Sequence, residues 1–328
     1  MSTATATRPV LLITMGGPRD LAEVETYLRR LFSDPYILPG NSFKRWLLSR
    51  IIARAAAKKS RARYALIGGR STAVEDTGLL AEQLKEDFAS RGITLECQVA
   101  TRYATPNIEE GLTSLSAETA EKDSDAVTPV YLFPHETSVM TGSCAGALER
   151  ASDESGVPVG TGVRHLGATR TYARGWADAI ERAVRAPGDT FVLFSCHSLP
   201  RTIIERGDAY VEQVERSVER IRARLRRLAG ELAYQSQARN DWLGPTVEEV
   251  ASEAYGKGYR ELIVVPLSFV GENTETLVDL DRELCAAALS MGFRRVERLR
   301  TPDKLGFLCP MVVEALCMEW GLEWKQAQ

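Results

Sequence analysis

The chain has 328 residues, of which 44% are hydrophobic and 26% charged, and its formal net charge is −3 at pH 7. This length exceeds a single ordinary hydrophobic core and predicts two domains. The composition is typical of a water-soluble globular protein, and the slightly acidic balance argues against a nucleic-acid partner. A basic stretch between Arg216 and Arg227 alternates with apolar residues, which is typical of a helix with one solvated basic face.

The cysteine pattern and the first residues bear on the compartment. None of the six cysteines forms a C-x-x-C pair, so free thiols in a reducing compartment are expected. The apolar run from Val10 to Met15 is too short for a signal peptide or a membrane span. We therefore predict a cytoplasmic protein.

Apolar, β-rich runs alternate with amphipathic stretches along the chain. The predicted strands cover residues 10–15, 95–99, 125–133, 160–164, 190–195, 232–236 and 261–267. The predicted helices cover a stretch around 24–31, one from about 106, and residues 171–186, 208–229 and 274–291. This alternation predicts an α/β fold with two doubly wound, parallel-sheet (Rossmann-like) domains facing a central cleft.

The domain boundary is expected in the segment 153–159, which contains Gly, Ser and Pro. We therefore predict an N-terminal domain of residues 1–157 and a C-terminal domain of residues 158–328. For the last helix, at about 306–324, packing back on the first domain is left open. Residues 36–56 interleave apolar groups with Lys and Arg, and they fit either a helix packed on the first domain or an apolar lip over a flat ligand or a membrane interface.

His197 is a candidate functional residue because it follows the buried-type strand 190–195. In doubly wound folds, ligands bind beyond the carboxyl ends of the strands. Histidine also titrates near neutrality, which suits proton transfer. A hydrogen-bonded core histidine is the alternative. Neighbouring residues of a strand point to opposite faces, so a nucleophile–base pair of Cys196 with His197 is disfavoured.

Three carboxylates, Glu275, Asp279 and Glu283, are spaced four residues apart and fall on one face of the predicted helix. They fit an exposed acidic stripe or a path for cations or protons. A π-type widening would align them better, and it often marks functional sites. Asn273 and Thr274 are good N-cap residue types, so the helix dipole favours the ionised form of Glu275.

Four blocks of the chain, between about Val10 and about Leu305, resemble the ferrochelatases, which insert ferrous iron into a porphyrin. The blocks are Met15–Pro18 with Leu28–Asp34, Arg102–Tyr103, Ser195–Pro200 with Arg206–Tyr210, and Val265–Leu277 preceded by Tyr234–Ser236 and Trp242–Pro245. The resemblance implies a chelatase fold and a lyase-type metal chelatase. Its reaction would convert protoporphyrin IX to protohaem with release of two protons, the final step of haem biosynthesis.

The resemblance also implies roles for individual residues. His197 matches the active-site histidine and Glu275 the glutamate opposite it, and these two are the implied catalytic and metal-binding residues. Asp279 and Glu283 match an acidic row of the family. The implied substrate-binding residues are Met15, which favours protoporphyrin IX, Phe269, which lines the cleft, Arg102, which suits a propionate, and Tyr103, Ser198 and Asn273.

Two alternatives stay open: a coproporphyrin III ferrochelatase, and a non-catalytic tetrapyrrole-binding protein on the same fold. We expect no resident cofactor, because Cys309 and Cys317 lack the spacing of the family's [2Fe–2S] cluster and Ser138 stands at its upstream position. The expected partners are porphyrin and ferrous iron, with no nucleic acid, for a monomer or homodimer. The expected location is the cytoplasm, with peripheral contact at the inner face of the membrane through the lip as an option. His135 with Glu136 is a candidate for an additional metal contact.

Overall fold

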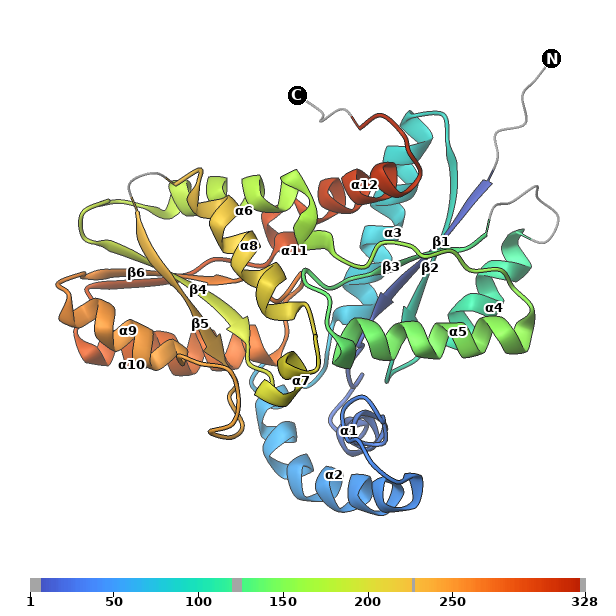
Figure 1. The fold of residues 1–328 in the computed structure, drawn as a ribbon, viewed down its shortest axis with the longest axis horizontal. Coiled ribbons are helices and arrows are strands. Elements are labelled where there is room, and N and C mark those ends of the chain that lie inside the picture. Colours follow the sequence, from blue (N-terminus) through green and yellow to red (C-terminus); the bar gives the residue numbers. More distant parts are fainter. Residues whose placement is uncertain (1–6, 120–125, 226–227, 325–328) are drawn as a thin grey trace. The chain divides into compact units, whose positions relative to one another are not determined.

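The computed structural model of the chain describes residues 7–119, 126–225 and 228–324 (Figure 1). The chain forms two compact units, each built around its own parallel sheet. Unit 1 comprises Met1–Phe133, Thr137–Leu166 and Val312–Gln328. Unit 2 comprises Pro134–Glu136 and Gly167–Met311.

Unit 1 contains a three-stranded parallel sheet in the order β2-β1-β3. The central strand is a continuous apolar run because helices cover both faces of a parallel sheet. The strands are β1 (Thr7–Thr14), β2 (Thr94–Thr101) and β3 (Thr128–Tyr131). The helices are α1 (Val24–Phe32), α2 (Ser42–Ala65), α3 (Ala73–Ser90), α4 (Ile108–Thr119), the π-helical turn η1 (Ser138–Gly142), α5 (Ser143–Ser155) and α12 (Leu308–Glu319), which joins this unit from Val312 onward.

Trp320, just after α12, fastens the C-terminal segment to unit 1. Its indole N–H donates to Thr128 Oγ1 at 3.1 Å. Its ring packs edge-on against Phe88 of α3, with the ring centroids 5.3 Å apart, and the Arg8 guanidinium lies 4.6 Å from its centroid. The segment from Val312 is therefore part of the unit 1 core.

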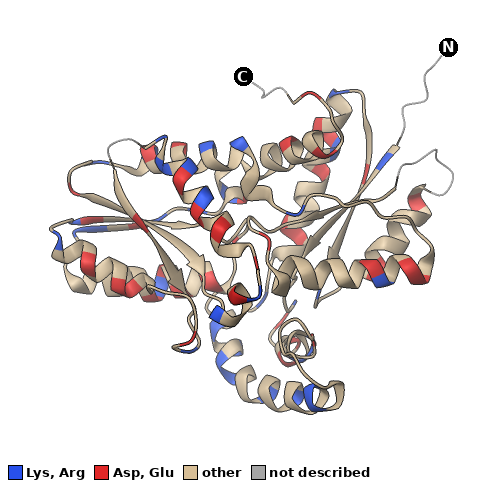
Figure 2. Ribbon diagram, in the orientation of Figure 1, with Lys and Arg blue, Asp and Glu red and all other residues tan. Residues whose placement is uncertain are grey.

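Helix α2 packs on α1 through small residues and leaves its large apolar residues exposed. The buried seam between the two helices contains Val24, Leu28, Ala53 and Ala57. The exposed large apolar residues, which we call the α2 lip, are Phe43, Trp46, Leu47, Leu48 and Ile51, with 44–71% of each residue exposed. Lys and Arg residues are interspersed along the same helix (Figure 2). One face of α2 therefore packs on unit 1, as the first sequence interpretation expects, whereas contact of the exposed lip with a flat ligand or a membrane stays a prediction.

Unit 2 contains a four-stranded parallel sheet in the order β5-β4-β6-β7. The strands are β4 (Thr190–His197), β5 (Ala229–Gln235), β6 (Glu261–Pro266) and β7 (Arg295–Arg298). The 3₁₀ turn η2 (Leu166–Ala168) leads into the unit. Its helices are α6 (Arg170–Ala183), α7 (Arg201–Glu205), α8 (Tyr210–Arg222), α9 (Val247–Gly256), the π-helix η3 (Glu275–Leu284), α10 (Cys285–Met291) and α11 (Pro302–Leu305).

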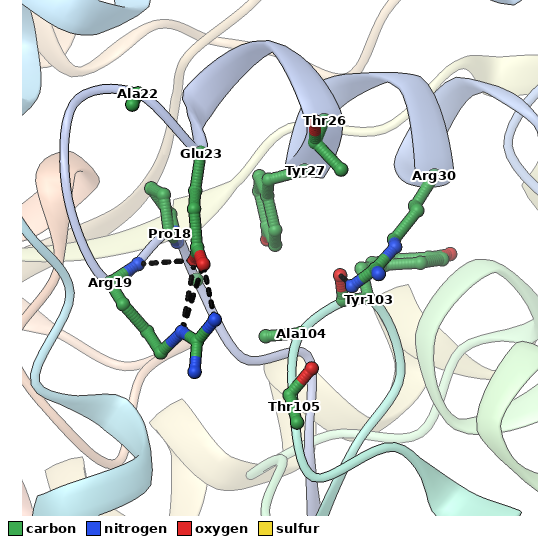
Figure 3. A pocket seen from close by; sticks show the side chains of 11 residues that line it. Pro18, Arg19, Ala22, Glu23, Thr26, Tyr27, Arg30, Tyr103, Ala104 and Thr105 are labelled. Carbon is green, nitrogen blue, oxygen red and sulfur yellow. Dashed lines mark hydrogen bonds and ion pairs between the residues drawn. The ribbon is translucent and has the colours of Figure 1, made fainter.

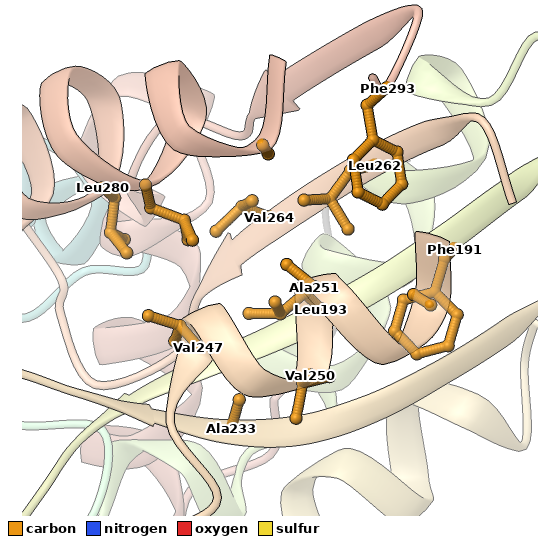
Figure 4. Close-up of a cluster of buried hydrophobic side chains, with 13 residues drawn as sticks. Phe191, Leu193, Ala233, Val247, Val250, Ala251, Leu262, Val264, Leu280 and Phe293 are labelled. Atoms are coloured by element: carbon orange, nitrogen blue, oxygen red, sulfur yellow. The ribbon is translucent and has the colours of Figure 1, made fainter. Parts of the chain in front are cut away.

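The core of unit 2 holds η3 against the sheet (Figure 4). Leu193 of β4 and Val264 of β6 are fully buried with Ala251 of α9 and Leu280 of η3. Burial of such side chains contributes about 1.5–3 kcal/mol each, so the sheet and η3 are placed mainly by apolar packing. Near the carboxyl end of β6, the hydroxyl of Tyr172 from α6 donates to the Leu267 carbonyl at 2.8 Å.

Two predicted elements were wrong in part. The predicted helix 208–229 ends at Arg222, and Ala229 already belongs to β5. The apolar spacing continued past the helix end because Leu225 is buried from the connecting loop. The predicted strand 160–164 forms only one isolated bridge, between Val163 and Val130 of β3, and a second bridge lies just before it, between Val159 and Val127. Residue 125 of the predicted strand 125–133 lies outside the described residues.

The helix η3 spans Glu275–Leu284 with π geometry, which is the widening that would align the three carboxylates better. In the part of the chain that the structure describes, no helix is both long and apolar enough to cross a membrane.

Candidate functional site

His197 is the last residue of β4, at the carboxyl edge of the unit 2 sheet. Hydrogen bonds hold its backbone on both sides: its N–H donates to Ser268 Oγ at 2.9 Å, and its carbonyl accepts from the Tyr210 hydroxyl at 2.9 Å. The Tyr210 hydroxyl also lies 2.8 Å from Ser268 Oγ. Burial raises the pKa of Tyr210 well above its usual range, so the group remains a phenol that can donate. The half-buried His197 therefore stands on a rigid strand end.

The hydrogen bond of the imidazole assigns its tautomer. Nδ1 lies 2.6 Å from the carbonyl oxygen of Ser198. Because a carbonyl oxygen can only accept, Nδ1 carries the hydrogen, and the neutral ring keeps its lone pair on Nε2. Nε2 is thus the atom of His197 that can accept a proton or bind a metal ion.

Glu275 is tied to the same sheet edge through Gln235. Gln235 ends β5 directly opposite His197 in the parallel register. Its Oε1 accepts from Ser195 Oγ at 2.6 Å, and its Nε2 donates to the Glu275 carbonyl at 3.1 Å. The Glu275 carboxylate itself accepts from Thr274 Oγ1 at 2.8 Å. One buried amide therefore links the strand that carries His197 to the first residue of η3.

The acidic row is only partly buried. Glu275 and Asp279 are half-buried and Glu283 is exposed. Asp279 accepts from Ser236 Oγ at 2.7 Å. Among the residues that the structure describes, no group of three or more His, Cys, Asp or Glu side chains is placed to hold a metal ion. The role of the row as a path for cations or protons stays a prediction.

Two predicted substrate contacts are engaged in local structure. The side-chain oxygen of Asn273 accepts from the Thr276 N–H at 3.0 Å and so caps η3, as its residue type indicated. Ser198 is fully buried, and its hydroxyl donates to the Leu243 carbonyl at 2.8 Å. These positions favour structural roles for both side chains. Phe269 is half-buried in the turn that follows β6.

A buried charge network anchors η3 to β7. The Arg298 side chain is 1% exposed, and its guanidinium donates to Glu272 at 2.8–2.9 Å and to Asp281 at 2.5–2.7 Å. Glu272 also accepts from the Thr276 hydroxyl at 2.7 Å. Removing one member of such a buried network typically costs about 3–5 kcal/mol. Arg298 therefore positions the loop before η3, which carries Glu275.

The remaining predicted residues, Met15, Arg102 and Tyr103, lie in unit 1. Met15 follows β1 and packs half-buried against the core. Arg102 Nη2 lies 2.7 Å from Oδ2 of Asp34, whose side chain is fully buried, and Arg102 Nε donates to Ser143 Oγ at 2.7 Å. The Tyr103 hydroxyl donates to the same Asp34 oxygen at 2.7 Å, and burial raises the pKa of Tyr103 so that it stays protonated. A propionate contact for Arg102 stays a prediction, and it must compete with Asp34.

Sequence reasoning assigned no role to Gln235, Ser268 or Tyr210. All three fall in blocks that resemble the family, which was the available signal, but their hydrogen bonds depend on the fold. His135 is buried, with Nε2 3.0 Å from Ser217 Oγ and its ring edge-on to Tyr210. This core position does not favour the predicted additional metal contact.

Cys196 is fully buried, and burial raises the pKa of its thiol to about 12. A thiol with that pKa stays protonated at neutral pH and is a poor nucleophile. The structure thus agrees with the prediction that Cys196 and His197 do not act as a nucleophile–base pair.

The chain, with its two parallel-sheet units, has the chelatase fold. Solved structures support this class. SirB from Bacillus subtilis with Fe³⁺ is similar at a TM-score of 0.55 and 12% identity, covering 78% of this chain and 94% of that one. DR2241 from Deinococcus radiodurans, described as structurally similar to chelatases, is similar at a TM-score of 0.51 and 14% identity, covering 94% of this chain and 55% of that one.

Sequence comparisons give the family. The ferrochelatase family model matches residues 7–316. A ferrochelatase of Aquifex aeolicus is 36% identical over 303 residues, covering 89% of this chain and 94% of the relative. One of Geotalea uraniireducens is 33% identical over 301 residues, covering 89% and 92%. The chain belongs to the ferrochelatase family and is a metal chelatase of the lyase class.

Ser236 provides a test of the backbone at this site. Its φ of 58° is left-handed, a conformation that costs a non-glycine residue about 1–2 kcal/mol. Ser236→Ala loses the hydrogen bond to Asp279 and keeps the strain, whereas Ser236→Gly loses the bond and relieves the strain. We expect Ser236→Ala to lower the free energy of unfolding by about 1 kcal/mol, and Ser236→Gly to be the more stable of the two, in urea unfolding.

Ser290 is the matched control, because its hydroxyl also makes one local hydrogen bond, to Ala286 at 2.9 Å, but within the right-handed helix α10. There the order should reverse, with the Gly variant less stable than the Ala variant by about 1 kcal/mol. The same order of stability at both serines would contradict the assignment of strain to Ser236.

Proposed function

We propose that this chain inserts ferrous iron into protoporphyrin IX to give protohaem, the final step of haem biosynthesis. Family membership supports metal insertion into a porphyrin. The finer substrate rests on Met15, because the protoporphyrin-using branch of the family often has methionine at this position and the coproporphyrin-using branch usually has tyrosine. Fe²⁺ is a substrate here, and the proposed reaction needs no resident cofactor or [2Fe–2S] cluster.

The chemistry requires a proton acceptor at a fixed place. Two pyrrole N–H bonds break as the metal binds the ring nitrogens, and both protons must leave. His197 accepts a proton at Nε2, because Nδ1 is already committed to the Ser198 carbonyl. Glu275 receives the second proton or balances the imidazolium charge, and Asp279 and Glu283 conduct cations or protons past η3. The Nδ1–carbonyl hydrogen bond is the observation that carries this proposal.

A metal-insertion assay tests both the reaction and the substrate. Purified protein is incubated anaerobically with Fe²⁺, or with Zn²⁺, and either protoporphyrin IX or coproporphyrin III. We expect metalloporphyrin to form faster than in buffer, with the higher kcat/KM for protoporphyrin IX. A higher value for coproporphyrin III would refute the substrate and keep the chelatase. No formation above the buffer rate would leave a non-catalytic tetrapyrrole-binding protein.

The role of His197 is tested by two variants. His197→Asn keeps an N–H donor at the place of Nδ1 and removes the lone pair of Nε2, whereas His197→Ala removes both. We expect kcat to fall by about 10²–10⁴ in both variants, while porphyrin binding, followed by absorbance, is retained. Near-normal turnover of His197→Asn would show that Nε2 is not the proton acceptor.

We also propose that the α2 lip rests on a membrane interface, at the inner face of the membrane. Its exposed apolar residues lie among Lys and Arg, which suits an anionic lipid surface. In co-sedimentation with vesicles containing anionic lipid, Phe43→Ser with Ile51→Ser should lower the bound fraction several-fold. Leu79→Ser, on α3, is the control because Leu79 is equally exposed, at 65%. An equal loss in both variants would refute the lip.

A further inference from the structure

We propose that unit 1 binds a small polyanion in an arginine-lined cavity, which we call the arginine cavity. It is an open hollow in the surface of unit 1, with a volume of about 620 Å³. Its walls come from α1, α2, the connection between β2 and α4, and α5, all within unit 1. Five arginines face three carboxylates in its lining: Arg29, Arg30, Arg50, Arg102 and Arg150 against Asp34, Glu109 and Glu154.

The arginines differ in whether the guanidinium group already has a bonding partner within the protein. Arg102 is paired with Asp34, as described above. Arg50 lies over the Trp46 ring, 3.8 Å from its centroid, and donates to the Trp46 carbonyl. Arg30 donates to the Tyr103 carbonyl at 3.2 Å. The side chains of these three arginines are therefore held in place by contacts within the protein.

Arg29 on α1 and Arg150 on α5 are exposed at the cavity, and within the described residues the structure records no hydrogen bond or ion pair for either guanidinium. Their charges are available to a ligand. Because guanidinium groups form paired hydrogen bonds with carboxylates and phosphates, both groups are suited to such anions.

The number and placement of these groups set the ligand class. Cationic side chains come from three different helices, and the cavity is much larger than one phosphate. A ligand with two or more carboxylate or phosphate groups fits this arrangement, whereas a single small anion leaves most of it unfilled.

The cavity next to it is different (Figure 3). It measures about 280 Å³, and there Arg19 is bonded to Glu23, with Arg19 Nε 3.0 Å from Oε1. Arg30 lines both cavities, but the other cation of the smaller one is paired with Glu23, so the anion site is assigned to the arginine cavity and not to its neighbour.

The arginine cavity shares a wall with residues that follow the sheet. The backbone N–H groups of Arg102 and Tyr103 donate to the carbonyls of Thr14 and Met15, at 2.9 and 3.2 Å. A bound polyanion would contact this segment, and the inference rests on the lining of the arginine cavity and not on the proposed function.

The test uses the full chain and isothermal titration calorimetry at constant ionic strength. Pyrophosphate and citrate are the probes, with orthophosphate for comparison. We expect saturable binding of one equivalent of at least one probe, tighter than orthophosphate. Tighter binding of pyrophosphate identifies phosphate groups as the preferred ligand chemistry, and tighter binding of citrate identifies carboxylates.

Three variants separate a built site from an effect of net charge. Arg29→Gln with Arg150→Gln should weaken binding at least tenfold and leave basal metal insertion unchanged, which also shows that the variant folds. Glu154→Gln should tighten binding several-fold. Arg185→Gln, an exposed arginine of unit 2, removes one positive charge elsewhere and should have no effect.

Absence of saturable binding for both polyanions would overturn the proposal. Equal weakening by Arg185→Gln and by either Arg29→Gln or Arg150→Gln, each measured singly, would also overturn it, because the effect would then follow net charge alone.

Discussion

The buried amide of Gln235 is the interaction on which the geometry of the candidate site depends. Parallel strands end at a common edge, but this arrangement alone leaves open how the following helix begins. The Gln235 amide fixes the start of that helix, because it accepts a hydrogen bond from Ser195 in β4 and donates one to the Glu275 carbonyl. An apolar residue at this position would leave a buried hydroxyl and a carbonyl without partners, at a cost of about 1–3 kcal/mol each. The histidine strand and the glutamate helix are therefore coupled through one side chain.

The wide helix η3 needs support of its own, because π geometry is rare and usually confined to a single turn. Three contacts hold it: Leu280 is fully buried in the core, Arg298 pairs with Asp281, and Glu272 accepts from Thr276. Repulsion between carboxylates four residues apart costs only some tenths of a kcal/mol per pair. The anchors outweigh that cost by an order of magnitude, so an acidic row can persist on this helix.

Features that depend on neighbouring residues could be predicted from the sequence, whereas contacts between residues far apart in the chain could not. The end of β4 at His197 and the start of η3 near Glu275 follow from apolar runs and capping residues, which are local signals. The pairing of Arg102 with Asp34 could not be predicted, because the two residues lie far apart in the chain and the pairing depends on tertiary packing. The predicted strand at 160–164 was wrong for a different reason: Val163 is the one apolar residue of this segment, and it forms only a single isolated bridge, to Val130.

Local sequence patterns also did not indicate which hydrogen bonds a side chain forms in the fold. Ser198 and Asn273 stand in blocks that resemble the family, yet one hydroxyl is buried on the Leu243 carbonyl and the other side chain caps η3. Residue type indicates which hydrogen bonds a group can form, whereas only the fold shows which bonds it has formed. Gln235 illustrates the converse, because its importance arises entirely from its register opposite His197.

The bonds already formed in the fold also decide which positive charges of unit 1 are available to a ligand. Asp34 is fully buried, and its oxygen accepts from both Arg102 and Tyr103. If Arg102 turned to a ligand carboxylate, a buried carboxylate would lose its counter-charge, which costs several kcal/mol. A new ion pair on a solvated ligand returns about 1 kcal/mol or less. The exchange is unfavourable unless the ligand is itself desolvated, so Arg102 acts on an anion most readily while still bonded to Asp34, as a fixed dipole and not as a mobile arm. Arg29 and Arg150 carry no such commitment within the described residues, so the arginine cavity can offer their charges to a ligand at little cost.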